Sequence, residues 1–303
     1  MNGVVIIDKP AGMTSHDVVN RVRRILHQPA VGHLGTLDPL ATGVLPLVAG
    51  NLTRLAQFYT SCEKTYEGTI RLGFATDTYD SDGEATSADQ IVNVSLEEVR
   101  SLAGKFVGII EQMPPPFSAK KIKGVPAYKL ARRHQDVPLS LVQVEIKEFE
   151  ILALRGNIGS FRARVASGTY MRSVAHDMGQ KIGCGAHLAS LRRTALGEFA
   201  LGDAHTLDEL KDAVEDGRAE EIFIHPRRLL PQLPCVTAND ETTALIRNGR
   251  SVNLAELSQA RQVKVFAGQR ELIAIATRIA GTLFHPRIVL LTDTARPKDA
   301  VSS

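Results

Sequence analysis

Apolar residues recur along the chain at two spacings, one typical of strands and one typical of helices. Residues 4–7 form a short β-branched run, which predicts a first strand. Thr14 or Ser15 can then cap a helix. Four apolar positions recur at helical spacing after this cap: Val18, Val22, Ile25 and Leu26. The chain is therefore predicted to open as strand, loop and helix.

Further along the chain, both periodicities continue. Strands are predicted over residues 66–74, 141–154 and 160–166, and a helix over about 170–182. Two helix starts carry capping boxes, in which a hydroxyl residue is followed three positions later by a glutamate: Ser95 with Glu98, and Thr206 with Glu209. Residues 28–50 are rich in Gly, Pro and Thr between short apolar pieces, so a long ordered loop is expected there.

The positions of the prolines along the chain predict two unequal domains. Repeated prolines in 225–234 stop regular elements and stiffen linkers, which places the boundary near residue 228. Strand candidates separated by turns follow at 263–268, 271–279 and 287–291. Residues 113–140 combine consecutive prolines with clustered Lys and Arg, and are predicted to be an exposed basic insertion. We expect a mixed α/β domain over 1–228 and a mostly β domain over 229–303 with a short disordered tail.

Composition narrows the class of protein. Apolar residues make up 44% and charged residues 23% of the chain, which is ordinary for a globular protein. A net charge of +3 means that a nucleic acid would have to be held by a local basic face. The three cysteines lie far apart, which indicates neither a disulfide framework nor a zinc site. With no signal peptide and no membrane-length apolar run, a cytoplasmic protein without membrane contact is expected.

The most informative stretch is GHLGTLDPLATGVL, residues 32–45. Pro39 disfavours helical geometry at Asp38, so the carboxylate is displayed from an extended or turning backbone. Glycines in the same stretch permit unusual φ angles or the close approach of a ligand. An Asp-Pro pair in a glycine-rich loop is most often an Asx-turn, and an active-site acid is the rarer alternative.

This stretch resembles the catalytic loop of the TruB family of tRNA pseudouridine synthases. Four further blocks resemble the family in the same order: GVVIIDKPAGMTSHDVV at 3–19, KTYEGTIRLGFATDTYDSDGE at 64–84, SGTYMRSVAHDMG at 167–179 and HLASLRRTALGEF at 187–199. The resemblance implies a pseudouridine synthase fold with a central, mostly antiparallel sheet flanked by helices and loops. It also implies a small C-terminal PUA-like β-barrel that binds RNA.

The resemblance implies a reaction as well as a fold. Uridine becomes pseudouridine when the bond from ribose C1′ to N1 breaks, the uracil turns, and C5 joins C1′, so neither a cofactor nor a metal is expected. The implied substrate is the uridine at position 55, in the T loop of tRNA. By the same resemblance, Asp38 is the catalytic carboxylate, Arg172 pairs with it and lowers its pKa, and Tyr66 is the active-site tyrosine.

Other residues take their expected roles from the same blocks. His33 is expected to fill the space left by the everted uridine, while Tyr170 and Leu191 line the uracil pocket. Lys9 and Pro10 are expected to buttress the tyrosine strand more than to react. Candidates for phosphate contacts are clustered cations, which suit an RNA backbone: Arg192, Arg193, Lys120, Lys121, Lys123, Arg132 and Arg133.

Two alternatives remain open at the level of sequence. The chain could be an RNA-binding protein that helps tRNA to fold without catalysis. The same carboxylate could also hydrolyse a nucleoside or glycoside, although such enzymes carry a second acid near the first and residues 32–45 contain none. The expected partner is the T-arm stem-loop of tRNA. A monomer with no obligatory protein partner is expected.

Overall fold

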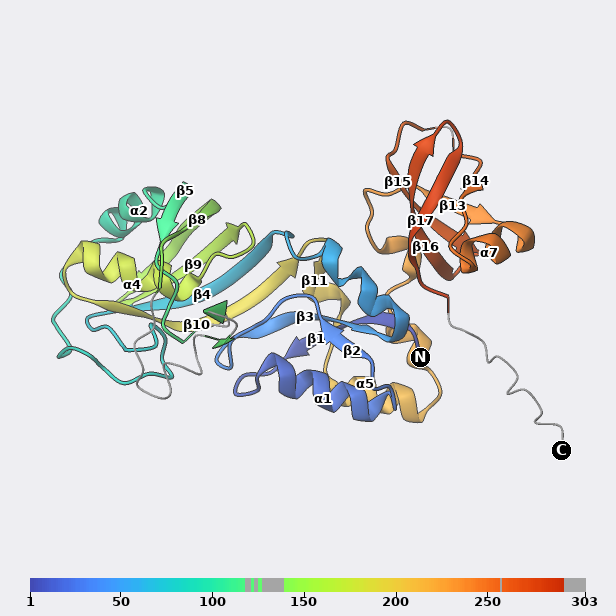
Figure 1. Cartoon of the computed structure of the whole chain (residues 1–303). Coiled ribbons are helices and arrows are strands. Elements are labelled where there is room, and N and C mark those ends of the chain that lie inside the picture. The colour runs from blue at the N-terminus through green and yellow to red at the C-terminus, as the bar shows by residue number, and fades with distance from the viewer. Residues whose placement is uncertain (118–120, 123–124, 127–138, 257, 292–303) are drawn as a thin grey trace.

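The computed structural model describes residues 1–117, 121–122, 125–126, 139–256 and 258–291. Figure 1 shows a large sheet flanked by helices, with a smaller β module at the C-terminal end. The first part of the large body contains β1 (Gly3–Lys9), α1 (Ser15–Ile25), β2 (Val31–His33), β3 (Thr42–Ala49), the 3-10 helix η1 (Gly50–Phe58), β4 (Lys64–Leu72), α2 (Leu96–Gly104), β5 (Gly108–Gln112), β6 (Lys121–Ile122) and β7 (Val125–Pro126).

The second part of the large body contains β8 (Val142–Arg155), β9 (Ile158–Val165), α4 (Met171–Ile182), β10 (Ala186–Leu196), β11 (Phe199–Ala200), η2 (Leu201–Asp203), β12 (Ala204–His205), α5 (Leu207–Glu215) and α6 (Ala219–Ile222). The C-terminal part contains η3 (Pro226–Arg228), β13 (Cys235–Ala238), α7 (Asp240–Arg247), β14 (Val252–Asn253), β15 (Gln262–Ala267), β16 (Glu271–Ala280) and β17 (Leu283–Val289).

The large sheet is mostly antiparallel, as predicted. Within the described residues its strands run in the order β12-β1-β3-β10-β4-β9-β8-β5, with β2 beside β3 and β11 beside β10. Among the described strands of this sheet, only the pairs β1–β12 and β3–β10 are parallel. The expectation of one long loop over 28–50 is wrong, because β2 and β3 pair within it and leave a loop at 34–41.

Both faces of the β1 end of this sheet are buried, which explains why the first strand has no polar alternation. Val5 and Ile7 join a core that contains the apolar face of α1. Val4 and Ile6 point the other way, into a second core that contains η1 and residues of the C-terminal sheet. The C-terminal part therefore packs on the face of the sheet opposite α1.

The capping signals in the sequence are local, and the structure bears them out. Capping boxes start α1 at Thr14, α2 at Ser95 and α5 at Thr206. Helix α4 begins at Met171, after Tyr170 as its N-cap residue, and ends at Ile182, before a left-handed Gly183 as its C-cap residue. Helix α4 packs on the half of the large sheet that contains β10 (Figure 1).

The C-terminal sheet has the order β13-β15-β16-β17-β14. Lys264 of β15 holds the segment that leads into this sheet, because its buried ammonium donates hydrogen bonds to the carbonyl oxygens of Arg227 at 2.9 Å and Leu229 at 2.6 Å. The domain boundary near 228 stays a prediction. The predicted insertion 113–140 lies largely outside the described residues, and so does the tail from 292. No helix in the described part of the chain is long and apolar enough to cross a membrane.

Candidate active site

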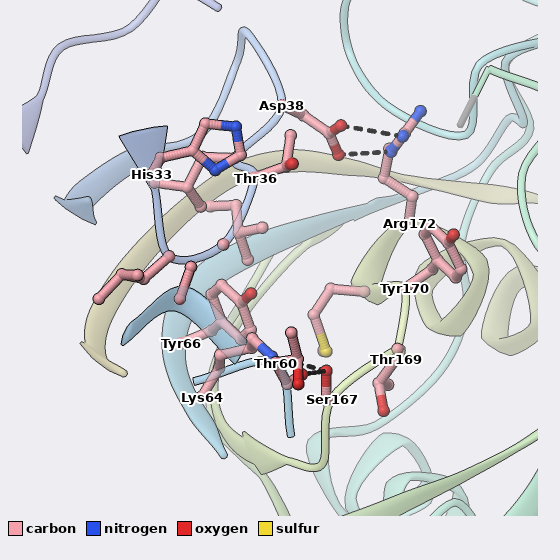
Figure 2. Close-up of a pocket in the computed structure, with 17 residues that line it drawn as sticks. His33, Thr36, Asp38, Thr60, Lys64, Tyr66, Ser167, Thr169, Tyr170 and Arg172 are labelled. Atoms are coloured by element: carbon pink, nitrogen blue, oxygen red, sulfur yellow. Dashed lines mark hydrogen bonds and ion pairs between the residues drawn. The ribbon is translucent and has the colours of Figure 1, made fainter. Parts of the chain in front are cut away.

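A cavity of about 570 Å³ opens between the 34–38 loop, β4, β10 and the start of α4. Figure 2 shows its side chains converging from these four segments. Six of the residues singled out in the sequence line it together: His33, Asp38, Tyr66, Tyr170, Arg172 and Leu191. The structure therefore brings together residues that are separated by more than 150 positions in the chain.

The Asp38 loop is fixed from two sides. The Ser15 hydroxyl, at the start of α1, accepts a hydrogen bond from the Leu37 amide at 2.8 Å and donates one to the Leu37 carbonyl at 3.0 Å. On the other side of Asp38, the Pro39 carbonyl accepts from the Gly12 amide at 2.9 Å and from the Lys9 ammonium at 3.1 Å. The carboxylate is thus held on a loop whose flanking peptide groups are both bound.

Asp38 forms a two-pronged ion pair with Arg172 (Figure 2). The Nε atom of Arg172 lies 2.9 Å from Oδ2 of Asp38, and Nη2 donates to Oδ1 at 3.1 Å. The Arg172 side chain is 5% exposed and the Asp38 side chain is 35% exposed, so the carboxylate faces the cavity while the guanidinium lies behind it. The planar guanidinium fixes the orientation of the carboxylate as well as its charge.

Asp80 is a member of this site that the sequence did not single out. Its Oδ2 atom lies 3.4 Å from Nη1 of Arg172, and its side chain is 6% exposed. Its Oδ1 atom accepts hydrogen bonds from the Thr78 hydroxyl at 2.6 Å and the Asp82 amide at 3.1 Å. Arg172 therefore bridges two carboxylates, and Asp80 holds the guanidinium from the side away from the cavity.

The pKa of Asp38 differs from the sequence expectation. Burial raises the pKa of the Asp38 carboxyl above its ordinary value, and the charge of Asp80 adds to the rise. The charge and hydrogen bonds of Arg172 lower it, as expected, but they do not outweigh burial. Arg172 therefore opposes the effect of burial and favours the ionised form of a partly desolvated carboxylate.

The segment after β5 holds the start of α4 in place. The Gln112 side chain, which is fully buried, accepts from the Tyr170 amide at 2.8 Å and donates to the Tyr170 carbonyl at 3.1 Å. The Ser173 hydroxyl donates to the Met113 carbonyl at 2.7 Å, and Nη2 of Arg172 donates to the Phe117 carbonyl at 2.9 Å. Residues 112–117 thus fix the backbone from which Arg172 projects, a role that no sequence pattern indicated.

Tyr66 forms one wall of the cavity from β4, with Arg193 behind it. Arg193 is fully buried and donates to the carbonyl oxygens of Val44 at 2.7 Å, Gly35 at 2.9 Å and Thr36 at 3.3 Å. Burial lowers the pKa of Arg193, and its hydrogen bond with Tyr66 opposes this. The Arg193 guanidinium therefore supports the backbone of the Asp38 loop. The sequence predicts that it contacts an RNA phosphate, but the side chain is buried and does not reach the surface.

Gly43 makes this arrangement sterically possible. It has a φ of +97°, and a Cβ atom there would lie 2.2 Å from the Arg193 carbonyl oxygen. Strands β3 and β10 can approach closely only if this position lacks a side chain. Neither Gly32 nor Gly35 has a positive φ, so Gly43 is the one glycine of residues 32–45 whose backbone conformation favours glycine.

His33 lies on the cavity wall opposite Arg172 (Figure 2). Burial lowers the pKa of its imidazole, and the charges of Arg193 and His16 lower it further, so the ring is neutral at pH 7. Within the described residues its Nδ1 atom is buried without a hydrogen-bond partner. The ring thus presents a flat, uncharged face to the cavity.

Lys9, Pro10 and Arg192 are not among the residues that line the cavity. Lys9 donates to the carbonyls of Pro10 at 2.8 Å, Met13 at 2.5 Å and Pro39 at 3.1 Å. Lys9 and Pro10 therefore support the Asp38 loop, whereas the sequence predicts that they support the Tyr66 strand. Burial lowers the pKa of Lys9 to about 8. Arg192 forms an ion pair of 2.6 Å with Asp8 on the surface.

The clustered cations of the predicted insertion are largely absent from the part of the chain that the structure describes. Lys120, Lys123, Arg132 and Arg133 lie outside the described residues, and only the backbone of Lys121 is described, in β6. Their phosphate contacts therefore stay predictions.

Two family profiles and several named proteins match the chain in sequence. The profile described as TruB family pseudouridylate synthase (N terminal domain) matches residues 23–171, and that of the tRNA pseudouridylate synthase B C-terminal domain matches 172–232. A protein of Solibacter usitatus named tRNA pseudouridine synthase B is 47% identical over 96% of this chain and 100% of its own length. A protein of the same name from Dehalococcoides mccartyi is 38% identical over 96% of this chain and 97% of its own.

Two solved structures have a similar fold over most of this chain. A chain of a Cbf5-Nop10-Gar1 complex matches with a TM-score of 0.71 and 27% identity, covering 95% of this chain and 85% of its own. A chain of an H/ACA RNP bound to a substrate RNA containing 2′-deoxyuridine matches with a TM-score of 0.70 and 25% identity, covering 96% and 85%. With two family profiles and a near full-length relative in agreement, this chain belongs to the TruB family of pseudouridylate synthases.

Proposed function

We propose that the chain converts uridine to pseudouridine at position 55, in the T loop of tRNA, with Asp38 as the catalytic carboxylate. The reaction class and the tRNA substrate follow from the family and from relatives named tRNA pseudouridine synthase B. The observation that supports the residue assignment is the Asp38–Arg172 ion pair, in which a carboxylate held at 2.9 Å by a buried guanidinium faces a nucleoside-sized cavity.

The charge of Asp38 matches the demand of the first step. When the bond between ribose C1′ and N1 breaks, its electron pair goes to the uracil and positive charge develops on the sugar. An ionised carboxylate at this position stabilises that charge, and a site of low polarity strengthens the attraction. Arg172, held in turn by Asp80, favours the negative form of Asp38 against the effect of burial.

The walls of the cavity suit the uracil while it turns. Tyr66 and Leu191 are both nearly buried and supply aromatic and apolar surface for the ring. After C5 joins C1′, the C5 hydrogen must leave as a proton, and N1 must gain one. The Tyr66 hydroxyl is the polar group that we assign to this transfer, because it is on the wall that the uracil contacts.

Base eversion is supported by the position of His33. A uridine inside a folded T loop has to leave its stack to reach the cavity, which costs a few kcal/mol. A neutral, flat imidazole at the cavity wall recovers part of that cost by occupying the gap. Because the cavity walls come from one chain, we also propose a monomer that needs no protein partner and acts on the T-arm in the cytoplasm.

Tritium release tests this proposal directly. A tRNA transcript labelled with tritium at uracil C5 should lose one label per tRNA to water when the protein is added without metal or cofactor. A transcript with cytidine at position 55 should lose none. Release of free uracil without tritium in the water would instead indicate hydrolysis and contradict the proposal.

A further inference from the structure

Lys64 lies at the end of the cavity opposite the Asp38–Arg172 pair. It is two residues before Tyr66 on β4, so both side chains project from the same face of the strand. Its ammonium donates to the Ser167 hydroxyl at 3.0 Å and to the Cys62 carbonyl at 2.9 Å. The Ser167 hydroxyl in turn donates to the Thr60 carbonyl at 2.6 Å, which Figure 2 shows as a short chain of polar contacts at this end.

The charge of Lys64 is not balanced by a neighbouring carboxylate. In the described part of the chain no Asp or Glu oxygen lies within 4.0 Å of its ammonium, whereas Lys147 pairs with Glu63 nearby. The guanidinium of Arg193 and the burial of Lys64 both lower the pKa of Lys64. An ammonium carries three donors, and the hydrogen bonds to Ser167 and Cys62 use two of them, so one donor remains for a ligand in the cavity.

The two ends of the cavity therefore differ in the sign of their charge. Asp38 and Asp80 share one guanidinium at one end, which leaves that cluster with an excess of negative charge. Lys64 and the buried Arg193 make the other end positive. Thr60 and Gly168, which flank the positive end, are exposed, so this end lies at the mouth of the cavity.

We propose that Lys64, held by the Ser167 hydroxyl, is an anion subsite that binds a backbone phosphate next to the everted uridine. This inference rests on the proposed function, because it assumes a polynucleotide substrate. Each nucleotide of such a substrate has a phosphate on either side of a ribose. A phosphate at Lys64 therefore orients the nucleotide with its sugar toward Asp38, and the base enters between them along Tyr66.

The test measures binding of a T-arm stem-loop to the full chain over a range of salt concentrations. For Lys64→Met we expect the Kd to rise by about tenfold, as for one lost charge-assisted hydrogen bond. The slope of log Kd against log salt should fall by about 0.7, as for one lost phosphate contact. Lys64→Arg should restore most of both values, because it keeps the charge.

A matched control separates the subsite from the overall field of the protein. Lys211 is a surface lysine on α5 that pairs with Glu215 at 3.6 Å and does not line the cavity. Lys211→Met removes the same charge, and we expect it to leave the Kd and the salt slope unchanged. Equal effects of Lys211→Met and Lys64→Met would overturn the proposal, since general attraction would then explain both.

A chemical change in the RNA tests the same contact from the other side. Stem-loops in which one linkage beside the target uridine is a neutral methylphosphonate should bind wild type more weakly. At the linkage that Lys64 contacts, they should cause no further loss in Lys64→Met. Independent, additive losses at both linkages would overturn the proposal. A fall in kcat with an unchanged salt slope would also overturn it, because Lys64 would then act on the uracil.

These readouts are distinct from those of the proposed function. Tritium release by wild type reports whether the reaction occurs, while the salt slope reports only whether a phosphate is held at Lys64. A protein that releases tritium but shows no change in slope refutes the subsite alone. Thermal unfolding of each variant shows whether the chain is folded, and Ser167→Ala, which removes only the hydroxyl beside Lys64, should give a smaller change in the same direction.

Discussion

Two buried arginines lie close to the Asp38 loop, and their surroundings differ. Arg172 is bound to two carboxylates, Asp38 at 2.9 Å and Asp80 at 3.4 Å, and it lines the cavity. Arg193 is bound to three backbone carbonyls within 3.3 Å and does not line the cavity. The first therefore sets the charge of the site, while the second sets the shape of the loop that displays it.

The comparison shows that two arginines from neighbouring motifs can have different roles, one in the chemistry of the site and one in holding its backbone. A guanidinium bound to a carboxylate that faces a cavity controls when that carboxylate is ionised. A guanidinium bound to carbonyls satisfies backbone acceptors that would otherwise be buried without partners. Lys9 belongs with Arg193 in this respect, because its ammonium binds three carbonyls on the other side of the same loop.

Substitution of Arg172 is expected to have the largest effect on activity and gives the strongest test of this difference between the two arginines. Arg172→Met leaves Asp38 and Asp80 near each other without a cation, so we expect kcat to fall by at least about 100-fold, a typical loss for one electrostatic contact in a catalytic site. Single-turnover tritium release at saturating RNA measures this. Arg172→Lys, which keeps the charge but not the fork, should recover only part of the rate. Full activity of Arg172→Met would contradict the role given to this residue.

At Arg193 the largest change should be in stability. Arg193→Met leaves the Val44, Gly35 and Thr36 carbonyls without this donor, and we expect the free energy of unfolding to fall by about 3 kcal/mol. Urea denaturation followed by circular dichroism measures the difference. A variant with wild-type stability but a rate as low as that of Arg172→Met would show that both arginines act on the chemistry, and the distinction drawn above would be wrong.

The pH dependence sharpens the role of Arg172. Activity requires ionised Asp38, so kcat/KM should fall as the pH drops through the raised pKa of this group. In Arg172→Lys the weaker partner should move this acid limb to higher pH, whereas Arg193→Lys should leave it in place. A pH series of initial rates tests both, and an identical limb in wild type and Arg172→Lys would count against the ion pair as its cause.

The raised pKa of Asp38 affects the stability of the fold in the opposite direction from activity, because low pH favours the folded state. Because the folded-state pKa of Asp38 lies above its ordinary value of 3.8, the folded state holds this proton more tightly than the unfolded state. The stability that this provides is complete below pH 3.8 and is lost as the pH rises through the raised pKa. Unfolding of wild type and Asp38→Asn should therefore differ in pH dependence over this window.

The smallest expected effect is at Gln112, which acts on Arg172 only through the backbone of Tyr170. Gln112→Leu removes two hydrogen bonds, and we expect kcat to fall by about tenfold while the Kd for tRNA stays within about twofold. Gln112→Glu keeps the acceptor for the Tyr170 amide and should lie between the two. A change confined to the Kd would show that this segment serves RNA binding and not the placement of Arg172.

The parts of the fold that depend on local sequence could be predicted, and those that depend on distant contacts could not. The helices capped at Thr14, Ser95 and Thr206 follow from residues three positions apart. By contrast, β2 and β3 were hidden by the Gly and Thr content of residues 28–50, since their conformation depends on the pairing of β3 with β1 and of β2 with β3.

The same division applies to the site. Asp38 and Arg172 could be singled out because the family's motifs contain them. Asp80 and Gln112 lie 92 and 58 positions from their partners, and neither has a spacing that indicates its contact. Arg193 reads as a surface charge beside Arg192, and only the close approach of β3 at Gly43 makes it an interior residue.

The central claim is that the ionised carboxylate of Asp38 performs the reaction and does not hold the fold together. The measurement that tests it most directly is tritium release by Asp38→Asn, made alongside its Kd for the same tRNA and its unfolding curve. We predict release at less than about one thousandth of the wild-type rate, with tRNA affinity and folding retained. Turnover at a substantial fraction of the wild-type rate in a folded, tRNA-binding Asp38→Asn protein would contradict the account.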